Sequence, residues 1–199
     1  MSTPVSQHFS KFPYHIGVVY NAPLQCGASN LLWPKPTGYK ATMVGLPYDD
    51  LASWRSIYPS TVFAGLLREM GNAFAAIADR LADEGGALKL DKRTRTAVHR
   101  ECNIIETISI HYRSIANQVD FIELRDALAT IAQNREAAKT KVARVLTDEI
   151  ALAKRLALLQ TGDSRLGYEA SNHYFYTPAD LREKVLNCRY LLDNWLMDA

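Results

Sequence analysis

The chain has 199 residues, 48% of them hydrophobic and 22% charged, which is an ordinary composition for one folded domain. A chain of this length buries enough surface to fold without a metal ion or a disulfide framework. Its 23 basic and 21 acidic residues leave a net charge of +2, so the charge balance does not point to nucleic acid as a partner. No stretch reaches the ~20 apolar residues of a transmembrane helix, and we expect no membrane as a partner.

Residues 1–47 differ from the rest, and their composition predicts an irregular, partly β N-terminal arm. Seven of the chain's eight prolines lie at or before Pro59, and proline removes a donor from a β-ladder. Short strands are expected at His15–Tyr20 and Tyr39–Val44, where β-favouring residues gather. The beginning of the chain lacks the apolar run of a signal peptide. We therefore expect a cytoplasmic protein, or a secreted or periplasmic one if the chain is a fragment of a larger protein.

Residues 48–199 are predicted to form a helical domain. A short helix is expected over Asp50–Ile57, and a longer helix opens at Pro59-Ser60-Thr61 and stops at Gly85-Gly86. The next helix starts near Asp91 and carries apolar residues spaced by three and four, as in the seam of an antiparallel bundle. The residues of this seam are Val98, Cys102, Ile105, Ile108, Tyr112, Ile115, Val119 and Ile122.

The second half of the chain predicts two more helices. A break near Gln133-Asn134 leads to a helix that Gly162 ends, and its inner side is apolar apart from Glu149. The last helix has the clearest start, with Thr177 as N-cap and Pro178 at its first position. The predicted fold class is mainly α, an antiparallel helical bundle of about four to five helices.

The standard signatures of nucleotide, metal and redox enzymes are absent, so we expect no cofactor and no bound metal. The five histidines do not pair at the spacing of metal ligands. Cys26, Cys102 and Cys188 lie far apart, and we expect all three thiols to be free. On the long helix, His111, Arg113, Asn117 and Gln118 stand among apolar residues. We expect a hydrogen-bonded core network there rather than a ligand site.

The stretch 162–177 is the most unusual in the chain, because it places many aromatic and polar residues in one connection between helices. Aromatic faces stack on pyranose rings, and carboxylate, amide and guanidinium groups hydrogen-bond to hydroxyls. The alternative is a loop that covers the end of the bundle, with Asp163 and Arg165 as a local ion pair. The expected sugar contacts in this stretch are Arg165, Tyr168, Asn172, His173, Tyr174 and Tyr176.

A second candidate stretch, 45–59, contains Tyr48, Asp49, Asp50 and Trp54. Glycoside hydrolysis uses two carboxylates, but adjacent side chains seldom face each other, so Asp49 and Asp50 are not expected to form such a pair together. Capping of the short helix is the favoured role for one of them.

Three segments, 38–59, 114–126 and 162–188, resemble the C-terminal helical region of large bacterial proteins of glycoside-hydrolase type. In such proteins a barrel is followed by a helical domain. A (β/α)₈ barrel needs ~250 residues by itself, and this chain has no room for one. The resemblance therefore implies a helical domain of a carbohydrate-active protein.

The leading hypothesis from the sequence is a domain that binds, and in one version hydrolyses, a glycan or oligosaccharide near the 162–177 loop together with Tyr48–Trp54. If the chain is an enzyme, we expect a glycoside hydrolase with Glu169 as general acid and Asp163 or Asp49 as the partner carboxylate. The alternative is a non-catalytic scaffold or interaction domain that docks on a missing barrel or on a second subunit. A helical binder of another small molecule is a third hypothesis.

Overall fold

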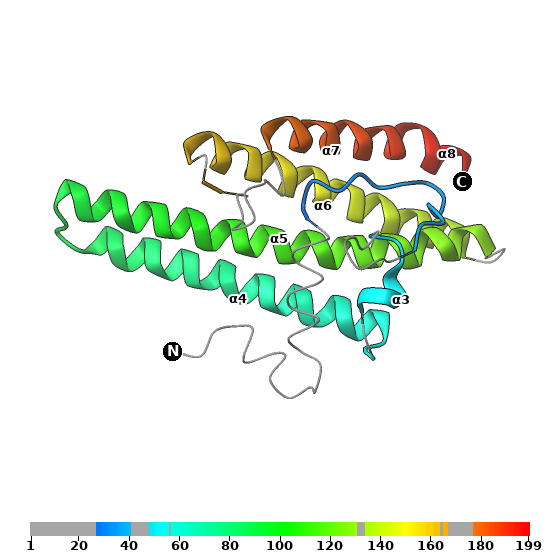
Figure 1. The fold of residues 1–199 in the computed structure, drawn as a ribbon, viewed down its shortest axis with the longest axis horizontal. Coiled ribbons are helices and arrows are strands. Elements are labelled where there is room, and N and C mark those ends of the chain that lie inside the picture. Colours follow the sequence, from blue (N-terminus) through cyan, green and yellow to red (C-terminus); the bar gives the residue numbers. More distant parts are fainter. Residues whose placement is uncertain (1–26, 41–47, 56, 131–133, 164, 167–176) are drawn as a thin grey trace.

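The computed structural model describes residues 27–40, 48–55, 57–130, 134–163, 165–166 and 177–199 (Figure 1). The short helix α3 spans Leu51–Trp54. The long helices that follow are α4 (Ser60–Ala87), α5 (Lys92–Thr130), α6 (Arg135–Gly162) and α7 (Pro178–Tyr190). A π-helical turn, η1 (Leu191–Trp195), and the short helix α8 (Leu196–Asp198) continue α7 to the end of the chain.

The long helices form the predicted antiparallel bundle. Figure 1 shows them running alternately in opposite directions, and α4 packs on α5, α5 on α6 and α6 on α7. The predicted seam of α5 is confirmed in its second half, where Tyr112, Ile115, Val119 and Ile122 are buried in the core. The residues of its first half, Val98, Cys102, Ile105 and Ile108, are only partly buried. The described residues contain no strand; the strand expected at His15–Tyr20 and most of that at Tyr39–Val44 lie outside them.

The caps explain where two of the helices begin. Asp91 accepts a hydrogen bond from the backbone N–H of Thr94 at 2.9 Å and so caps α5 where its start was predicted. Thr177 and Asp180 form a reciprocal capping box at the start of α7, with Pro178 at its first position. Both starts follow from local hydrogen bonds, and for this reason they could be predicted from the sequence.

The predicted end of α4 is wrong, because the helix continues through Gly85 and Gly86 to Ala87. A Cβ atom added at Gly85 would lie 2.8 Å from Cγ1 of Val98 on α5. The glycine therefore allows the two helices to approach closely near their turn, and its role is packing rather than termination.

The short helix α3 is also smaller than predicted. It ends at Trp54 instead of Ile57, and Asp50 occupies its N-cap position without a capping hydrogen bond from its side chain. The carboxylate of Asp50 instead accepts from Nζ of Lys40 at 3.1 Å. The predicted capping role is therefore not filled by Asp50, and Asp49 is engaged elsewhere, as described below.

In the described part of the chain, no helix is both long and apolar enough to cross a lipid bilayer.

Candidate functional site

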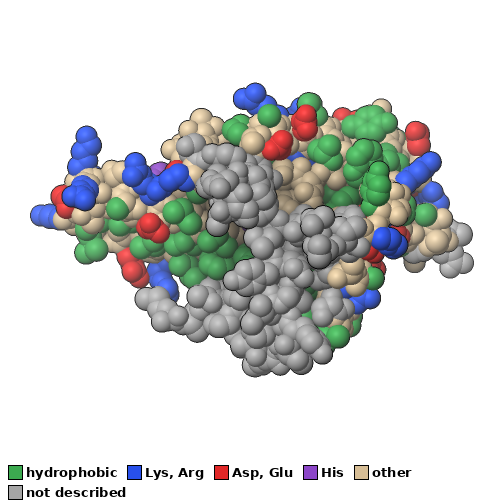
Figure 2. Space-filling view, viewed as in Figure 1, with side chains coloured by type: hydrophobic (Ala, Val, Ile, Leu, Met, Phe, Trp, Pro, Cys, Tyr) green, Lys and Arg blue, Asp and Glu red, His purple; other side chains and the backbone are tan. Residues whose placement is uncertain are grey.

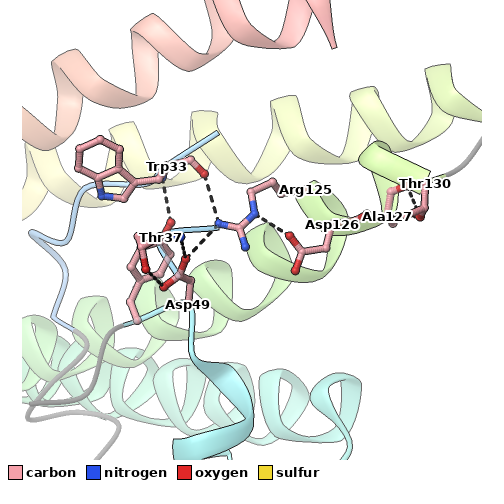
Figure 3. Close-up of polar contacts among 8 residues, drawn as sticks. Trp33, Thr37, Asp49, Arg125, Asp126, Ala127 and Thr130 are labelled. Atoms are coloured by element: carbon pink, nitrogen blue, oxygen red, sulfur yellow. Dashed lines mark hydrogen bonds and ion pairs between the residues drawn. The ribbon is translucent and has the colours of Figure 1, made fainter. Parts of the chain in front are cut away.

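The candidate stretch 45–59 contributes to a buried polar cluster around Asp49 and Arg125 (Figure 3). The side chain of Asp49 is only 2% exposed, and its carboxylate accepts from the backbone N–H of Thr37 at 2.6 Å and from the Thr37 hydroxyl at 2.7 Å. Nη1 of Arg125 lies 3.5 Å from the same carboxylate, and Nε of Arg125 donates to Asp126. Both oxygens of Asp49 are thus occupied by contacts that hold the chain together.

The neighbours of Asp49 in the candidate stretch have separate environments. The Tyr48 hydroxyl accepts from the backbone N–H of Trp33 at 2.9 Å, and burial raises the pKa of Tyr48 to about 12. Asp50 pairs with Lys40, as described above. Trp54 belongs to α3, but its side chain lies outside the described residues.

The candidate stretch 162–177 begins with an ion pair between Asp163 and Arg165. Nε and Nη2 of Arg165 donate to the two carboxylate oxygens of Asp163 at 2.8 and 2.5 Å. These hydrogen bonds lower the pKa of Asp163 to about 2, so its carboxyl group stays ionised at neutral pH. The remaining predicted residues of this stretch, Tyr168, Glu169, Asn172, His173, Tyr174 and Tyr176, lie outside the described residues.

Asp49 and Asp163 are placed at opposite ends of α5. Arg165 lies in a surface hollow with Arg100 and Glu101 near the start of α5, whereas Asp49 contacts Arg125 near its end. Arg100 and Arg125 are 25 residues apart on one continuous helix (125 − 100), a distance of about 37 Å at 1.5 Å per residue. The carboxylates of glycoside hydrolases are roughly 5 to 10 Å apart, so these two do not act on one glycosidic bond.

A buried ion pair joins the helices at the centre of the bundle. The side chains of Lys184 on α7 and Glu149 on α6 are 0% and 1% exposed, and Nζ lies 3.0 Å from Oε2. The carboxylate of Glu149 also accepts from the Ser114 hydroxyl at 2.8 Å and from the Asn117 amide at 2.9 Å. The inward position of Glu149 was predicted from its helical spacing, but Lys184 was missed because lysine is seldom buried.

Segment 27–37 is attached to the bundle by side chains that bind its backbone. Gln118 donates to the carbonyl of Gly27 at 2.9 Å, and Lys184 donates to that of Asn30 at 2.5 Å. Asn187 donates to the carbonyl of Leu32 and accepts from its N–H, at 2.9 and 2.8 Å. The predicted burial and hydrogen bonding of Gln118 are confirmed, whereas His111 is only half-buried.

A groove runs along the bundle between α4 and α6, with α5 as its floor. Its central part, which we call the central cleft, has a volume of about 270 Å³ and is bordered by polar residues of all three helices. The groove continues as a hollow of about 530 Å³ toward the start of α4 and one of about 810 Å³ toward the α4–α5 turn. The polar residues of the central cleft are Arg68, Asn72, Arg113, Asn117, Arg144 and Asp148.

Three of these side chains are positioned by contacts that the structure shows. Gly71 is buried against Arg113, and a Cβ atom at this position would lie 2.6 Å from Cγ of the arginine. Nη2 of Arg68 donates to Asp120 at 2.6 Å. The amide of Asn117 is held by Glu149 of the buried ion pair. The central cleft is therefore built on the core of the bundle.

Arg113 and Arg144 form no ion pair or hydrogen bond with any residue of the described part of the chain. The outer groove arginine Arg155, in contrast, is paired with both oxygens of Glu106 at 2.6 Å. Among the described residues of the groove, Arg95 and Lys141 also have no carboxylate partner, but only the central cleft is bordered by unpaired arginines of two helices.

The groove was not predicted, and the core network expected on α5 is confirmed only in part. Asn117 and Gln118 are buried and hydrogen-bonded, whereas Arg113 is exposed and borders the groove. The polar residues of α4 and α6 along the groove repeat at the spacing of a solvated helix face. Only the packing of α4 and α6 on the same side of α5 brings these residues together.

Among the described residues, no three histidine, cysteine, aspartate or glutamate side chains gather as ligands for a metal ion. Comparison with known proteins gives no relative: no protein-family model, no curated protein and no solved structure matches this chain.

Proposed function

We propose that this chain is a non-catalytic recognition domain that binds a linear glycan in the groove between α4 and α6. The observation that carries the proposal is the groove itself, which offers hydrogen-bond donors and acceptors from three helices along its length. Its residues on α4 extend from Ser60 to Gly86, a distance of about 39 Å at 1.5 Å per residue.

The mixed chemistry of the groove favours a glycan over other extended ligands. Sugar hydroxyls both donate and accept, so they match a surface that alternates basic, amide and acidic side chains. Asp79, Glu106, Asp120, Glu123 and Asp148 also border the groove, and carboxylates repel the phosphates of a nucleic acid. A partner helix needs an apolar seam along its whole length. The hollow toward the α4–α5 turn is lined largely by alanine, glycine and aliphatic residues, but the central cleft interrupts it with polar residues of all three helices.

The contacts of Asp49 and Asp163, the two carboxylates suggested from the sequence as partners of the general acid, agree with a domain that binds a glycan without hydrolysing it. Asp49 is buried and bonded to Thr37 and Arg125, and Asp163 is paired with Arg165. The resemblance of the chain to helical regions of carbohydrate-active proteins supports the same class of ligand. The contact of the 162–177 loop with sugar stays a prediction.

The test is binding of linear oligosaccharides, neutral and acidic, to the purified chain by isothermal titration calorimetry. We expect the parent chain to bind a glycan. Asn72→Trp should abolish this binding, because the indole would fill the central cleft, whereas Ala76→Trp should leave it intact. Both positions are exposed on α4, but only Asn72 borders the groove.

Two results would contradict the proposal. One is the absence of binding for every glycan. The other is binding that Asn72→Trp does not change but Tyr174→Ala removes, which would assign the site to the 162–177 loop. Circular dichroism of each variant checks that the helices are retained.

A second candidate function, docking on a further protein subunit, is favoured by one surface. Leu186 and Tyr190 lie one helical turn apart on α7 and are 64% and 60% exposed, and Met197 on α8 is 74% exposed. Figure 2 shows hydrophobic side chains gathered over this end of the molecule. Exposed apolar groups on one helix face are typical of a protein interface.

A further inference from the structure

We propose that the central cleft binds an anionic group of the glycan, a carboxylate or a sulfate ester carried by a sugar ring. This inference rests on the proposed function and names the class of sugar that the groove selects. No other part of the groove described above combines arginines of three helices with so small a volume.

The charges of the central cleft carry the inference. Arg68, Arg113 and Arg144 come from α4, α5 and α6, and all three border the same cleft of about 270 Å³. The carboxylates near them are Asp120, which Arg68 binds, and Asp148, which lies within 4.0 Å of no described cationic group. With these two carboxylates the cleft has three positive and two negative charges (3 − 2 = +1), and Lys141 and Glu123 of the adjoining hollow add one charge of each sign, so one further anion would balance the charge.

The arginines of the cleft are open to solvent, since Arg113 and Arg144 are exposed, but two of the three are positioned by contacts with other helices. The stem of Arg113 passes over the backbone of α4 at Gly71, where any side chain would meet it. A glycine inside a helix costs about 1 kcal/mol relative to alanine, so this close approach opposes the preference of the helix. The guanidinium of Arg68 is held in place by Asp120 at 2.6 Å.

The geometry of the side chains fits an oxyanion on a sugar. A guanidinium group presents parallel N–H donors that match the two oxygens of a carboxylate or of a sulfate ester. The amides of Asn72 and Asn117 stand in the same cleft, where they can bond to the neighbouring ring hydroxyls. An uncharged sugar would leave Arg113 and Arg144 without a partner.

The experiment measures the affinity of the full chain for three dextran oligomers of similar length: one that carries a single carboxylate, one that carries a single sulfate ester and one that is neutral. We expect one of the anionic probes to bind at least tenfold more tightly than neutral dextran. A tenfold difference in affinity is what one pair of charge-assisted hydrogen bonds contributes. The stronger of the two anionic probes identifies the oxyanion. Binding of the anionic probe should weaken as the salt concentration rises.

The variants are Arg113→Gln and Arg144→Gln, with Arg189→Gln as control, because Arg189 is exposed on α7 and does not border the groove. Each cleft variant should weaken binding of the anionic probe about tenfold and weaken binding of neutral dextran by a smaller factor, because a hydroxyl loses only an uncharged hydrogen bond. Arg113→Lys retains the positive charge but loses the two parallel N–H donors of the guanidinium group. We therefore expect it to lower the affinity for the anionic probe by less than Arg113→Gln does.

The outcomes separate the inference from the proposed function. The inference is overturned if the neutral and anionic probes bind equally well. It is also overturned if the cleft variants bind the anionic probe as tightly as Arg189→Gln does. In both cases the groove would still be a glycan-binding site. Absence of binding for all three probes, with the helical circular dichroism signal intact, overturns the proposed function as well.

Discussion

Adjacent side chains in this protein can have different structural roles, as Asp49 and Asp50 show: one belongs to a buried ion pair and the other pairs with a solvated lysine. Asp49 is buried with Arg125 and binds the backbone of Thr37, so it fixes the segment that precedes α3 to the end of α5. Asp50 holds Lys40, whose side chain is 80% exposed. Two adjacent carboxylates therefore differ in the free energy that their removal should cost.

Asp49→Asn should lower the free energy of unfolding by about 3 kcal/mol, because it leaves the guanidinium of Arg125 buried without its second carboxylate. Asp50→Asn should change it by less than about 1 kcal/mol, since its partner is solvated. Urea denaturation followed by circular dichroism measures both. Equal costs for the two variants would show that the buried cluster does not stabilise the fold.

At the scale of the helices, glycines set how closely α4 and α5 approach. Gly71 faces α5, and a Cβ atom there would lie 2.6 Å from Arg113 and 3.1 Å from the carbonyl oxygen of Ser109. Gly65 is on the same helix and has nothing within 4 Å of such an atom. Helix propensity favours alanine at both positions, so any difference between them reports the contact between the helices.

Gly71→Ala should lower the free energy of unfolding by about 2 kcal/mol, because the methyl group forces α4 and α5 apart. Gly65→Ala should raise it by about 0.5 to 1 kcal/mol, since the helix gains propensity without a clash. Thermal unfolding of the two variants beside the parent chain gives the comparison. A stabilising Gly71→Ala would mean that the helices do not pack as described.

At the scale of the whole molecule, the groove and the exposed face of α7 lie on different elements. The groove belongs to α4, α5 and α6, whereas the exposed apolar side chains belong to α7 and α8. The buried pair Glu149–Lys184 connects the two regions, because it joins α6 to α7 and also holds Asn117 of the central cleft. The proposed ligand site and the proposed protein-binding face would therefore not overlap.

The α7 face should associate with a second copy of the chain, since burial of Leu186 and Tyr190 removes two large apolar side chains from water. Sedimentation velocity over a range of concentrations should show a dimer that Tyr190→Glu weakens at least tenfold, because a charge would then be buried in the interface. Leu88→Glu is the matched control, as Leu88 is 60% exposed but lies at the α4–α5 turn. A monomer at all concentrations would remove the argument for self-association.

The sequence by itself determined the helices and most of their ends. The spacing of apolar residues on α5 predicted which of its sides is buried, and Thr177, Pro178 and Asp180 predicted the start of α7. These features depend on interactions within a few residues of each other, so the local sequence contains them. The same local rule failed at Gly85-Gly86, because the helix continues to Ala87 and Gly85 packs against Val98 of another helix.

Only the tertiary structure decided how the polar residues combine. Arg68 and Arg144 have the spacing of solvated positions and Arg113 was expected in a core network, yet the packing of α4 and α6 on α5 places all three around one cleft. No prediction placed Lys184 in the core, where it is buried with Glu149. Asp49 and Asp163 are alternative partners of Glu169 in the sequence hypothesis, and their contacts with Arg125 and Arg165 place them near opposite ends of α5. The reason is that these charged side chains interact with partners that are distant in the sequence. A sequence pattern reports only interactions between residues that are close together in the chain.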